Sequence, residues 1–206
     1  MNDIGVFQSI LKKNEYKTLR MGLIWLAFTL LVTYTLQSLA LIPDRKYTDF
    51  IGDKVNTWFL IIGYLSLLIP IIIAKKWKWL GFVAYSGIIG TIAVHALKFT
   101  VGKNLPRPSG SKGGFPSGHA EASFILAYLI SSRYPKLSIP IFLIASVITW
   151  SRVPFEHYFY QIVGGGILGL LVVGIMDRKT ANRESLETEK SEALHSPCTE
   201  RTGDVG

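Results

Sequence analysis

Five basic side chains and two histidines lie around the ends of four apolar segments, and together they have the chemistry of a phosphate site. The basic residues are Lys98, Lys103, Arg107, Lys112 and Arg152, and the histidines are His119 and His157. Arginine forks, lysine charges and glycine backbone N–H groups all bind phosphate oxygens. A histidine beside a bound phosphate can act as a nucleophile or as a general acid. We therefore expect phosphoryl chemistry.

Residues 116–119 read Pro-Ser-Gly-His and stand at the start of a predicted helix. The free backbone N–H groups and the dipole at a helix N-terminus favour an anion. Metal binding is the other common use of histidine, but no close ligand spacing such as H-E-x-x-H occurs in this sequence. Glu121 is the only carboxylate near His119. The pattern favours an anion site over a metal site.

Six apolar segments must position these residues. They cover residues 21–43, 55–74, 79–97, 119–132, 137–150 and 158–176. A helix that crosses a bilayer needs about 20 residues, so the fourth and fifth segments are long enough only if flanking residues extend them. With 49% hydrophobic and 17% charged residues, the sequence predicts an all-α integral membrane bundle of six transmembrane helices.

Lysine and arginine predict how this bundle is oriented. They precede the first segment, separate the second from the third and the fourth from the fifth, and follow the sixth. The positive-inside rule makes this side cytoplasmic, so the active site is expected at the outer face. We expect a cytoplasmic segment at 1–20, a membrane domain at 21–176 and a polar, disordered cytoplasmic tail at 177–206. The basic residues divide between two faces, so no nucleic-acid partner is expected.

The motifs resemble those of the type 2 phosphatidic acid phosphatase superfamily, a group of membrane proteins with six helices. Its first motif is Lys, six residues, Arg-Pro, and Arg107 with Pro108 matches the end of it. Residues 116–119 match its second motif, Pro-Ser-Gly-His. Ser151, Arg152 and His157 match most of its third motif, which is Ser-Arg, five residues, His, three residues, Asp. The resemblance extends from about residue 55 to 176.

The resemblance implies a role for each matching residue. His157 would attack phosphorus and form a phosphohistidine, and His119 would protonate the leaving alcohol. The phosphoryl oxygens would be held by Lys98, Arg107, Ser117, Gly118 and Arg152. No metal or organic cofactor is implied, so the resemblance predicts a metal-independent phosphatase.

Two spacings depart from the family pattern. Eight residues separate Lys98 from Arg107, where the motif has six. Lys103 is the competing candidate, but it lies too close to Arg107, and a loop absorbs two extra residues at little cost. We therefore favour Lys98. In the third motif only four residues separate Arg152 from His157, where the pattern has five.

The third departure concerns the aspartate that should orient the nucleophile, because Gln161 stands in its place. The i,i+4 spacing from His157 is kept, and a glutamine carbonyl can accept the imidazole N–H. Glutamine adds no negative charge, so the imidazole should be less basic. Glu156 should point away from His157, since adjacent helical residues point apart. A tolerated orienting group, a slow enzyme and a degenerate, non-catalytic relative all remain open.

The expected partner is a lipid phosphate in the outer leaflet of the membrane. The compact chain and its Arg-Pro-Ser-Gly-Ser and Phe-Pro-Ser-Gly-His sequences are most similar to bacterial lipid A 1-phosphatases, which act on the periplasmic side of the inner membrane. That likeness implies an inner-membrane location with both termini cytoplasmic. Phosphatases of phosphatidylglycerophosphate, undecaprenyl pyrophosphate or phosphatidic acid, and lipid phosphotransferases, would carry the same motifs. A membrane scaffold and an anion transporter are the non-enzymatic alternatives.

Overall fold

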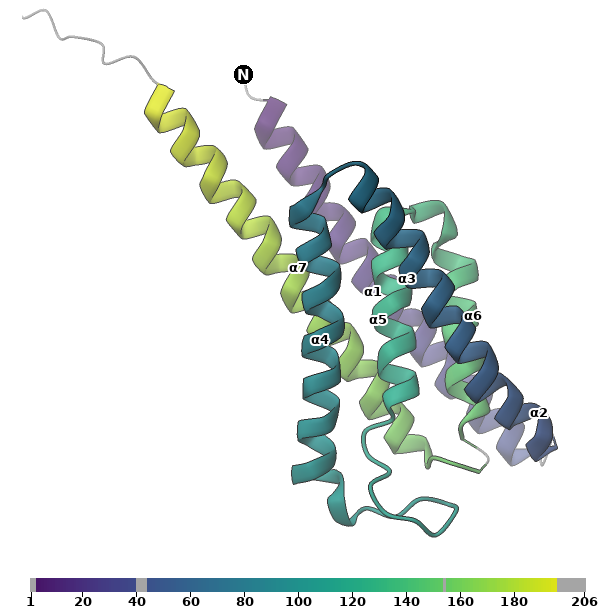
Figure 1. Cartoon of the computed structure of the whole chain (residues 1–206). Helices are drawn as coiled ribbons and strands as arrows, with labels where there is room; N and C mark the ends of the chain where they lie inside the picture. Colours follow the sequence, from purple (N-terminus) through teal and green to yellow (C-terminus); the bar gives the residue numbers. More distant parts are fainter. Residues whose placement is uncertain (1–2, 40–43, 154, 196–206) are drawn as a thin grey trace, which may run out of the picture.

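The computed structural model describes residues 3–39, 44–153 and 155–195 (Figure 1). These residues form no strand, so the all-α prediction is confirmed for them. Six helices have 14 residues or more: α1 Asp3–Ser38, α3 Asn56–Ile73, α4 Trp77–Thr100, α5 Gly118–Arg133, α6 Ser138–Ser151 and α7 Phe159–His195.

Helix α5 is the centre of the bundle and packs against α1, α3, α4, α6 and α7. Its side chains from Phe124 to Leu129 are at most 1% exposed. A helix that is apolar on every side must be surrounded by other helices. The stretch from Phe124 to Leu129 has this composition, and its central position in the bundle accounts for it.

Four helical segments are long and apolar enough to cross a membrane: Tyr16–Ser38, Arg45–Ile73, Trp77–Thr100 and Phe159–Thr180. Helices α5 and α6 have 16 and 14 residues, fewer than the length of a full span. The chain is thus a multi-pass membrane protein, and the predicted count of six spans is supported for four helices.

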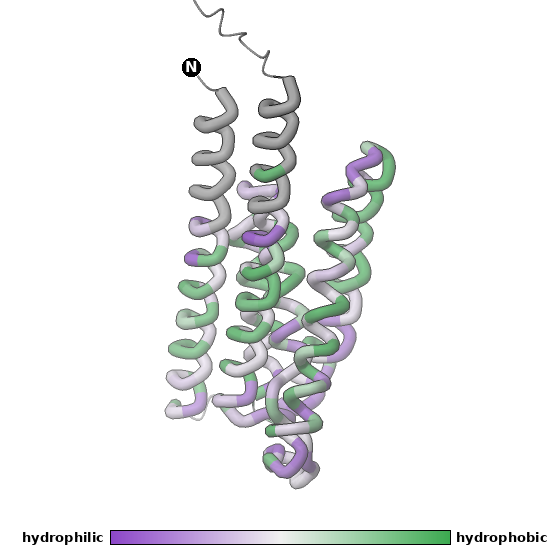
Figure 2. Tube along the Cα trace, turned by 90° about the vertical axis from the view of Figure 1, so that its left-hand side faces the viewer, coloured by the Kyte–Doolittle hydropathy of each residue, from purple (hydrophilic) through white to green (hydrophobic). Residues whose placement is uncertain are grey.

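The outer faces of the long helices are apolar. Leu31, Ile62, Ile73 and Ile92 are between 61% and 76% exposed. Hydrophobic residues are frequent along the middle of the helices, whereas hydrophilic residues gather towards their ends (Figure 2). Apolar surface of this extent is expected where lipid, not water, is the surrounding solvent.

Residues 44–54, which lie between the first two apolar segments of the sequence, are largely helical. Helix α2 Arg45–Asp49 and the π-helix η1 Phe50–Val55 lead directly into α3. The Asp44 carboxylate begins α2 by accepting a hydrogen bond from the Lys46 backbone N–H at 3.2 Å. Such an N-cap satisfies an otherwise unpaired donor, so a charged sequence can still be helical.

The predicted change to a disordered tail at Asp177 is not seen, because α7 continues through His195. Residues 177–195 are rich in Glu, Lys, Arg, Ala and Leu, which are good helix formers and prolong a packed helix at little cost. Residues 196–206, also assigned to the tail, lie outside the described residues. The start of α1 and the end of α7 lie at the same end of the bundle, opposite the loop between α4 and α5 (Figure 1).

Two glycines let α7 approach the start of α5 closely. A Cβ atom on Gly169 would lie 2.6 Å from the Glu121 carbonyl oxygen, and one on Gly165 would meet the Ser117 carbonyl oxygen. Small residues at helix contacts allow such an approach in membrane bundles. The contact brings the first turn of α7 against the first turn of α5, and both turns carry residues with candidate chemistry.

Candidate active site

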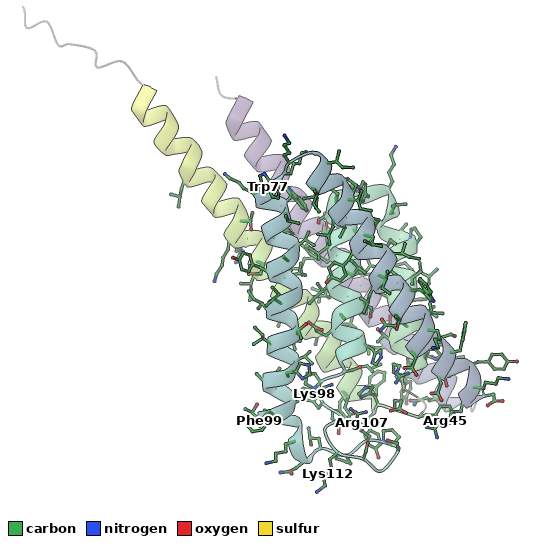
Figure 3. All side chains as sticks on the ribbon, in the orientation of Figure 1. Arg45, Trp77, Lys98, Phe99, Arg107 and Lys112 are labelled. Carbon is green, nitrogen blue, oxygen red and sulfur yellow. The ribbon has the colours of Figure 1, made fainter. Side chains whose placement is uncertain are left out.

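Most of the sequence-predicted residues meet at one end of the bundle, where α4 and α6 end and α5 and α7 begin. Lys98 and Arg107 lie at this end, whereas Trp77, at the start of α4, lies at the opposite end (Figure 3). Ser117, Arg152, His157 and Gln161 are between 0% and 7% exposed. The polar residues are therefore enclosed by protein at the end of an otherwise apolar bundle.

Gln161 fixes the ring of His157. The Gln161 Nε2 amide donates to the Pro106 carbonyl oxygen at 2.7 Å. Because a carbonyl oxygen only accepts, the amide nitrogen must face Pro106 and Oε1 must face the other way. Oε1 accepts the Tyr158 backbone N–H at 3.2 Å and lies 3.0 Å from His157 Nδ1. His157 Nδ1 therefore carries the hydrogen, and Nε2 keeps the free lone pair.

The turn between α6 and α7 accommodates the short third motif. The backbone N–H groups of Glu156 and His157 both donate to the Arg152 carbonyl oxygen, at 3.1 and 2.9 Å. This tight turn returns His157 to the end of α6 with four intervening residues. The guanidinium of Arg152 is buried, and its Nε has no hydrogen-bond partner among the described residues.

The first turn of α5 offers hydrogen-bond donors at the same place. Ser117 precedes the helix, is fully buried, and donates its backbone N–H to the Gln161 carbonyl oxygen at 2.9 Å. Its hydroxyl is buried and has no partner among the described residues. The following N–H groups, from Gly118 onward, belong to a helix N-terminus, where the first donors have no intrahelical acceptor.

Lys98 and Lys103 occupy different environments. The Lys98 ammonium lies 3.8 Å from the point that a Cβ atom on Gly118 would occupy, so it reaches the start of α5. Lys103 is exposed and its ammonium lies over the Phe99 ring, 5.7 Å from the centroid. Lys112 is exposed in the loop beyond them (Figure 3). Of the three lysines, Lys98, which the sequence analysis favours over Lys103, is the one that reaches the start of α5.

We expect Lys98→Ala to lower kcat/KM for phosphate release by about 10- to 100-fold, because one charge-assisted contact to the phosphate is lost. Lys103→Ala should stay within about twofold of the wild type, since exposed cations contribute little. Steady-state rates of both purified variants test this pair. A larger loss in Lys103→Ala than in Lys98→Ala would reverse the assignment.

Arg107 joins the site from the loop between α4 and α5. Its Nη2 donates to the Gly113 carbonyl oxygen at 3.3 Å, and its Nη1 lies 3.6 Å from Glu156 Oε2. Glu156 also lies 3.7 Å from Arg45 Nη2. The Glu156 carboxylate thus pairs with two arginines instead of orienting His157, in agreement with the sequence argument.

One residue of the site was absent from the sequence analysis. Asp53 Oδ1, on η1, accepts a hydrogen bond from Arg152 Nη1 at 3.0 Å and lies 3.9 Å from His119 Nε2. No motif spacing connects residue 53 to residue 152. The neighbouring Gly52, whose missing side chain lets η1 lie against Arg152, was the only local signal.

Burial and neighbouring charges keep His157 neutral. Burial, together with the charges of Arg107 and Arg152, lowers the pKa of His157 to about 4, although the hydrogen bond to Gln161 opposes this shift. At pH 7 the imidazole therefore has a free lone pair on Nε2. Within the described part of the chain, no group of three His, Cys, Asp or Glu side chains could hold a metal ion. The arrangement can attack an electrophile next to several anion-binding donors.

Comparison with known proteins gives one match. The family model described as the PAP2 superfamily matches residues 79–184, just over half of the 206 residues. The match includes every residue of the site except Asp53. Searches among curated proteins and among solved structures each found no significant match.

Proposed function

Because this chain belongs to the PAP2 superfamily, we propose that it is a membrane lipid phosphatase that hydrolyses a phosphomonoester of a lipid headgroup through a phosphohistidine. Members of the superfamily are generally metal-independent phosphatases. The observation that carries the proposal is the bond between Gln161 Oε1 and His157 Nδ1, because it leaves Nε2 of a buried, neutral imidazole as the nucleophile.

In the proposed first step, His157 Nε2 forms a bond to phosphorus while the bond from phosphorus to the leaving oxygen breaks. His119 gives its proton to that oxygen, so the lipid alcohol leaves neutral. In the second step His119 takes a proton from water, water attacks phosphorus, and the bond to Nε2 breaks. The product is inorganic phosphate, and both histidines return to their starting forms.

Five groups support the charge that develops on the phosphoryl oxygens in this proposal. They are the side chains of Lys98, Arg107, Ser117 and Arg152 and the backbone N–H of Gly118. Phosphoryl transfer is catalysed mainly by positioning and electrostatic stabilisation, and enclosed donors act more strongly than donors in water. The unpartnered Ser117 hydroxyl and Arg152 Nε fit such a role, since a buried donor without a partner is costly until an acceptor arrives.

A lipid substrate is supported by the apolar surroundings of the site. A cavity of about 820 Å³ lies between α3, α5 and α6, and its lining includes Trp58, Ile130 and Ile141. Phe50 and Lys54 of η1 lie at the end of the lining that adjoins Asp53. Hydrocarbon in this cavity would lie within the apolar belt while the headgroup reached the polar end of the bundle.

Within the lipid phosphatases we propose lipid A 1-phosphate as the substrate, acted on at the periplasmic face of a bacterial inner membrane. The support is the likeness of the chain length and of the two serine-glycine motifs to lipid A 1-phosphatases. Both termini would then be cytoplasmic, because the start of α1 and the end of α7 lie at the end of the bundle opposite the loop between α4 and α5, which carries Arg107 of the site (Figure 1).

The deciding experiment measures phosphate release by detergent-purified protein, with and without a chelator. The substrates are lipid A, phosphatidylglycerophosphate, undecaprenyl pyrophosphate and phosphatidic acid. We expect chelator-resistant release, fastest from lipid A. Faster release from another lipid would replace the substrate but keep the class. Release that needs a metal ion, or no release from any lipid, would contradict the proposed function.

A second expectation concerns pH. Protonation of His157 removes the nucleophile, so kcat/KM should fall as the pH decreases from 7 towards 4, the pKa of this histidine. Gln161→Asp adds a negative charge beside the ring, which raises its pKa, and the acid limb should move to higher pH by about one unit. Gln161→Asn has the same shape without the charge and serves as the matched control. Acid limbs of the kcat/KM profile that lie at the same pH in the Asp and Asn variants would contradict this electrostatic explanation.

A further inference from the structure

The carboxylate of Asp53 contacts two groups with different roles in the proposed reaction. Its Oδ1 accepts a hydrogen bond from Arg152 Nη1 at 3.0 Å and lies 3.9 Å from His119 Nε2. Arg152 is the buried cation of the phosphate site, and His119 is the proposed general acid. Asp53 lies outside residues 79–184, so the family match assigns it no role.

The fold holds Asp53 in this place. Gly52 is buried against Arg152, and a Cβ atom there would lie 2.5 Å from Arg152 Cδ. A side chain at position 52 would therefore separate η1 from the end of α6. The segment Phe50–Val55 is a π-helix, a conformation that occurs mostly as single turns at functional sites. The Thr57 hydroxyl donates to the Asp53 carbonyl oxygen at 2.6 Å and supports the next turn.

We propose that Asp53 is a positioning residue that orients Arg152 and stabilises the protonated form of His119, an inference that rests on the proposed function. By accepting from Nη1, Asp53 leaves Arg152 Nε and Nη2 for phosphate oxygens. At 3.9 Å, Asp53 Oδ1 is close enough to His119 Nε2 for an ion pair but too far for a hydrogen bond. The Nε2 proton therefore stays available to the leaving oxygen.

Burial and the surrounding cations make this contribution necessary, because burial first, and then the cations, lower the pKa of His119 to about 4. The cations and the second histidine that act on it come from the end of α4, the following loop and the turn before α7: they are Lys98, Arg107, Arg152 and His157. All of these cations oppose a positive charge on the imidazole. Among the described groups that act on His119, the Asp53 carboxylate on η1 is the one that favours a positive charge on its imidazole.

The test compares Asp53→Asn with the wild type on two substrates. A lipid phosphate has an alkoxide leaving group that needs a proton, whereas p-nitrophenyl phosphate does not. We expect Asp53→Asn to lower kcat on the lipid about tenfold, to change kcat on p-nitrophenyl phosphate by less than about threefold, and to move the basic limb of the lipid profile to lower pH. Asp53→Glu should restore part of the loss.

The matched control is Asp49→Asn, which removes a carboxylate one turn earlier. Asp49 pairs with Arg45 at 3.4 Å, and its side chain is 41% exposed. This variant should stay within about twofold of the wild type on both substrates. Equal losses of Asp53→Asn on the two substrates would overturn the positioning role. A higher kcat/KM on both would instead identify Asp53 as a competitor for the phosphate site, and would also overturn it.

A measurement without turnover separates this inference from the proposed function. The imidazole of His119 can be titrated by NMR in detergent, with His119→Ala identifying its signal. The midpoint should fall by about one pH unit in Asp53→Asn, because an opposite charge at ion-pair distance is removed. An unchanged midpoint would overturn the inference even in an active enzyme. A lowered midpoint in a protein that releases no phosphate would retain the electrostatic contact and reject the phosphatase.

Discussion

Replacing His157 by alanine should lower phosphate release by at least about 10³-fold, because the covalent route loses its nucleophile. The residue is 3% exposed, and its Nδ1 is engaged by Gln161, which leaves Nε2 for the attack. The measurement is release from the preferred lipid. It is accompanied by a search for an acid-labile phosphoryl group on protein quenched during turnover, which should be present in the wild type and absent from the variant.

His95→Ala is the control for this prediction. His95 is an exposed histidine on α4, three residues before Lys98, so the variant makes the same substitution near the site end of the bundle without touching the phosphate site. Its rate should stay within about twofold of the wild type. A His157→Ala enzyme that retains more than about a tenth of the wild-type rate would exclude the phosphohistidine mechanism.

His119→Ala should lower release from a lipid phosphate by about 10²- to 10³-fold, since an alkoxide must then leave without a proton. With p-nitrophenyl phosphate the loss should be about tenfold or less, because that leaving group is stable as an anion. The backbone carbonyl of His119 accepts a hydrogen bond from the Ser123 hydroxyl within α5, so the helix has local support that does not depend on the imidazole.

The ratio of the two rates is the decisive quantity for His119. If His119 only binds phosphate, both substrates should lose activity equally. The double variant Asp53→Asn with His119→Ala adds a test of coupling: its lipid rate should lie within about threefold of that of His119→Ala alone, because the larger effect of Asp53 acts through His119 and only its smaller effect on Arg152 remains. A further tenfold loss in the double variant would show that the two residues act separately.

Much of the site follows from local spacing in the sequence. The i,i+4 spacing predicts that Gln161 lies beside His157, and the two side chains do meet, although His157 lies in the turn just before α7 and only Gln161 is in the helix. Residues 116–119 span the start of α5, which begins at Gly118, so their donors lie at its N-terminus. The choice of Lys98 over Lys103 follows from continuity with the apolar segment. These are relations within a single helix or loop, where the chain itself limits the geometry.

Other features were beyond such reasoning. The sequence analysis predicts no helix between the apolar segments 21–43 and 55–74, yet α2 and η1 are helical, because one N-cap and continuity with α3 outweigh a polar composition. The six-span prediction was limited in the same way, because hydropathy alone does not distinguish a lipid-facing helix from α5, which is surrounded by other helices.

The sequence by itself determined the chemistry of this protein: two histidines, an anion-binding helix start and a set of cations, in an order typical of one superfamily. The tertiary structure decided which charges act on those groups. Asp53 and Arg152 are 99 residues apart in the chain, and Glu156 reaches Arg45 and Arg107 on two other segments. Such contacts arise only when η1 packs against α6 and the loop folds over α7, and no local spacing encodes that packing.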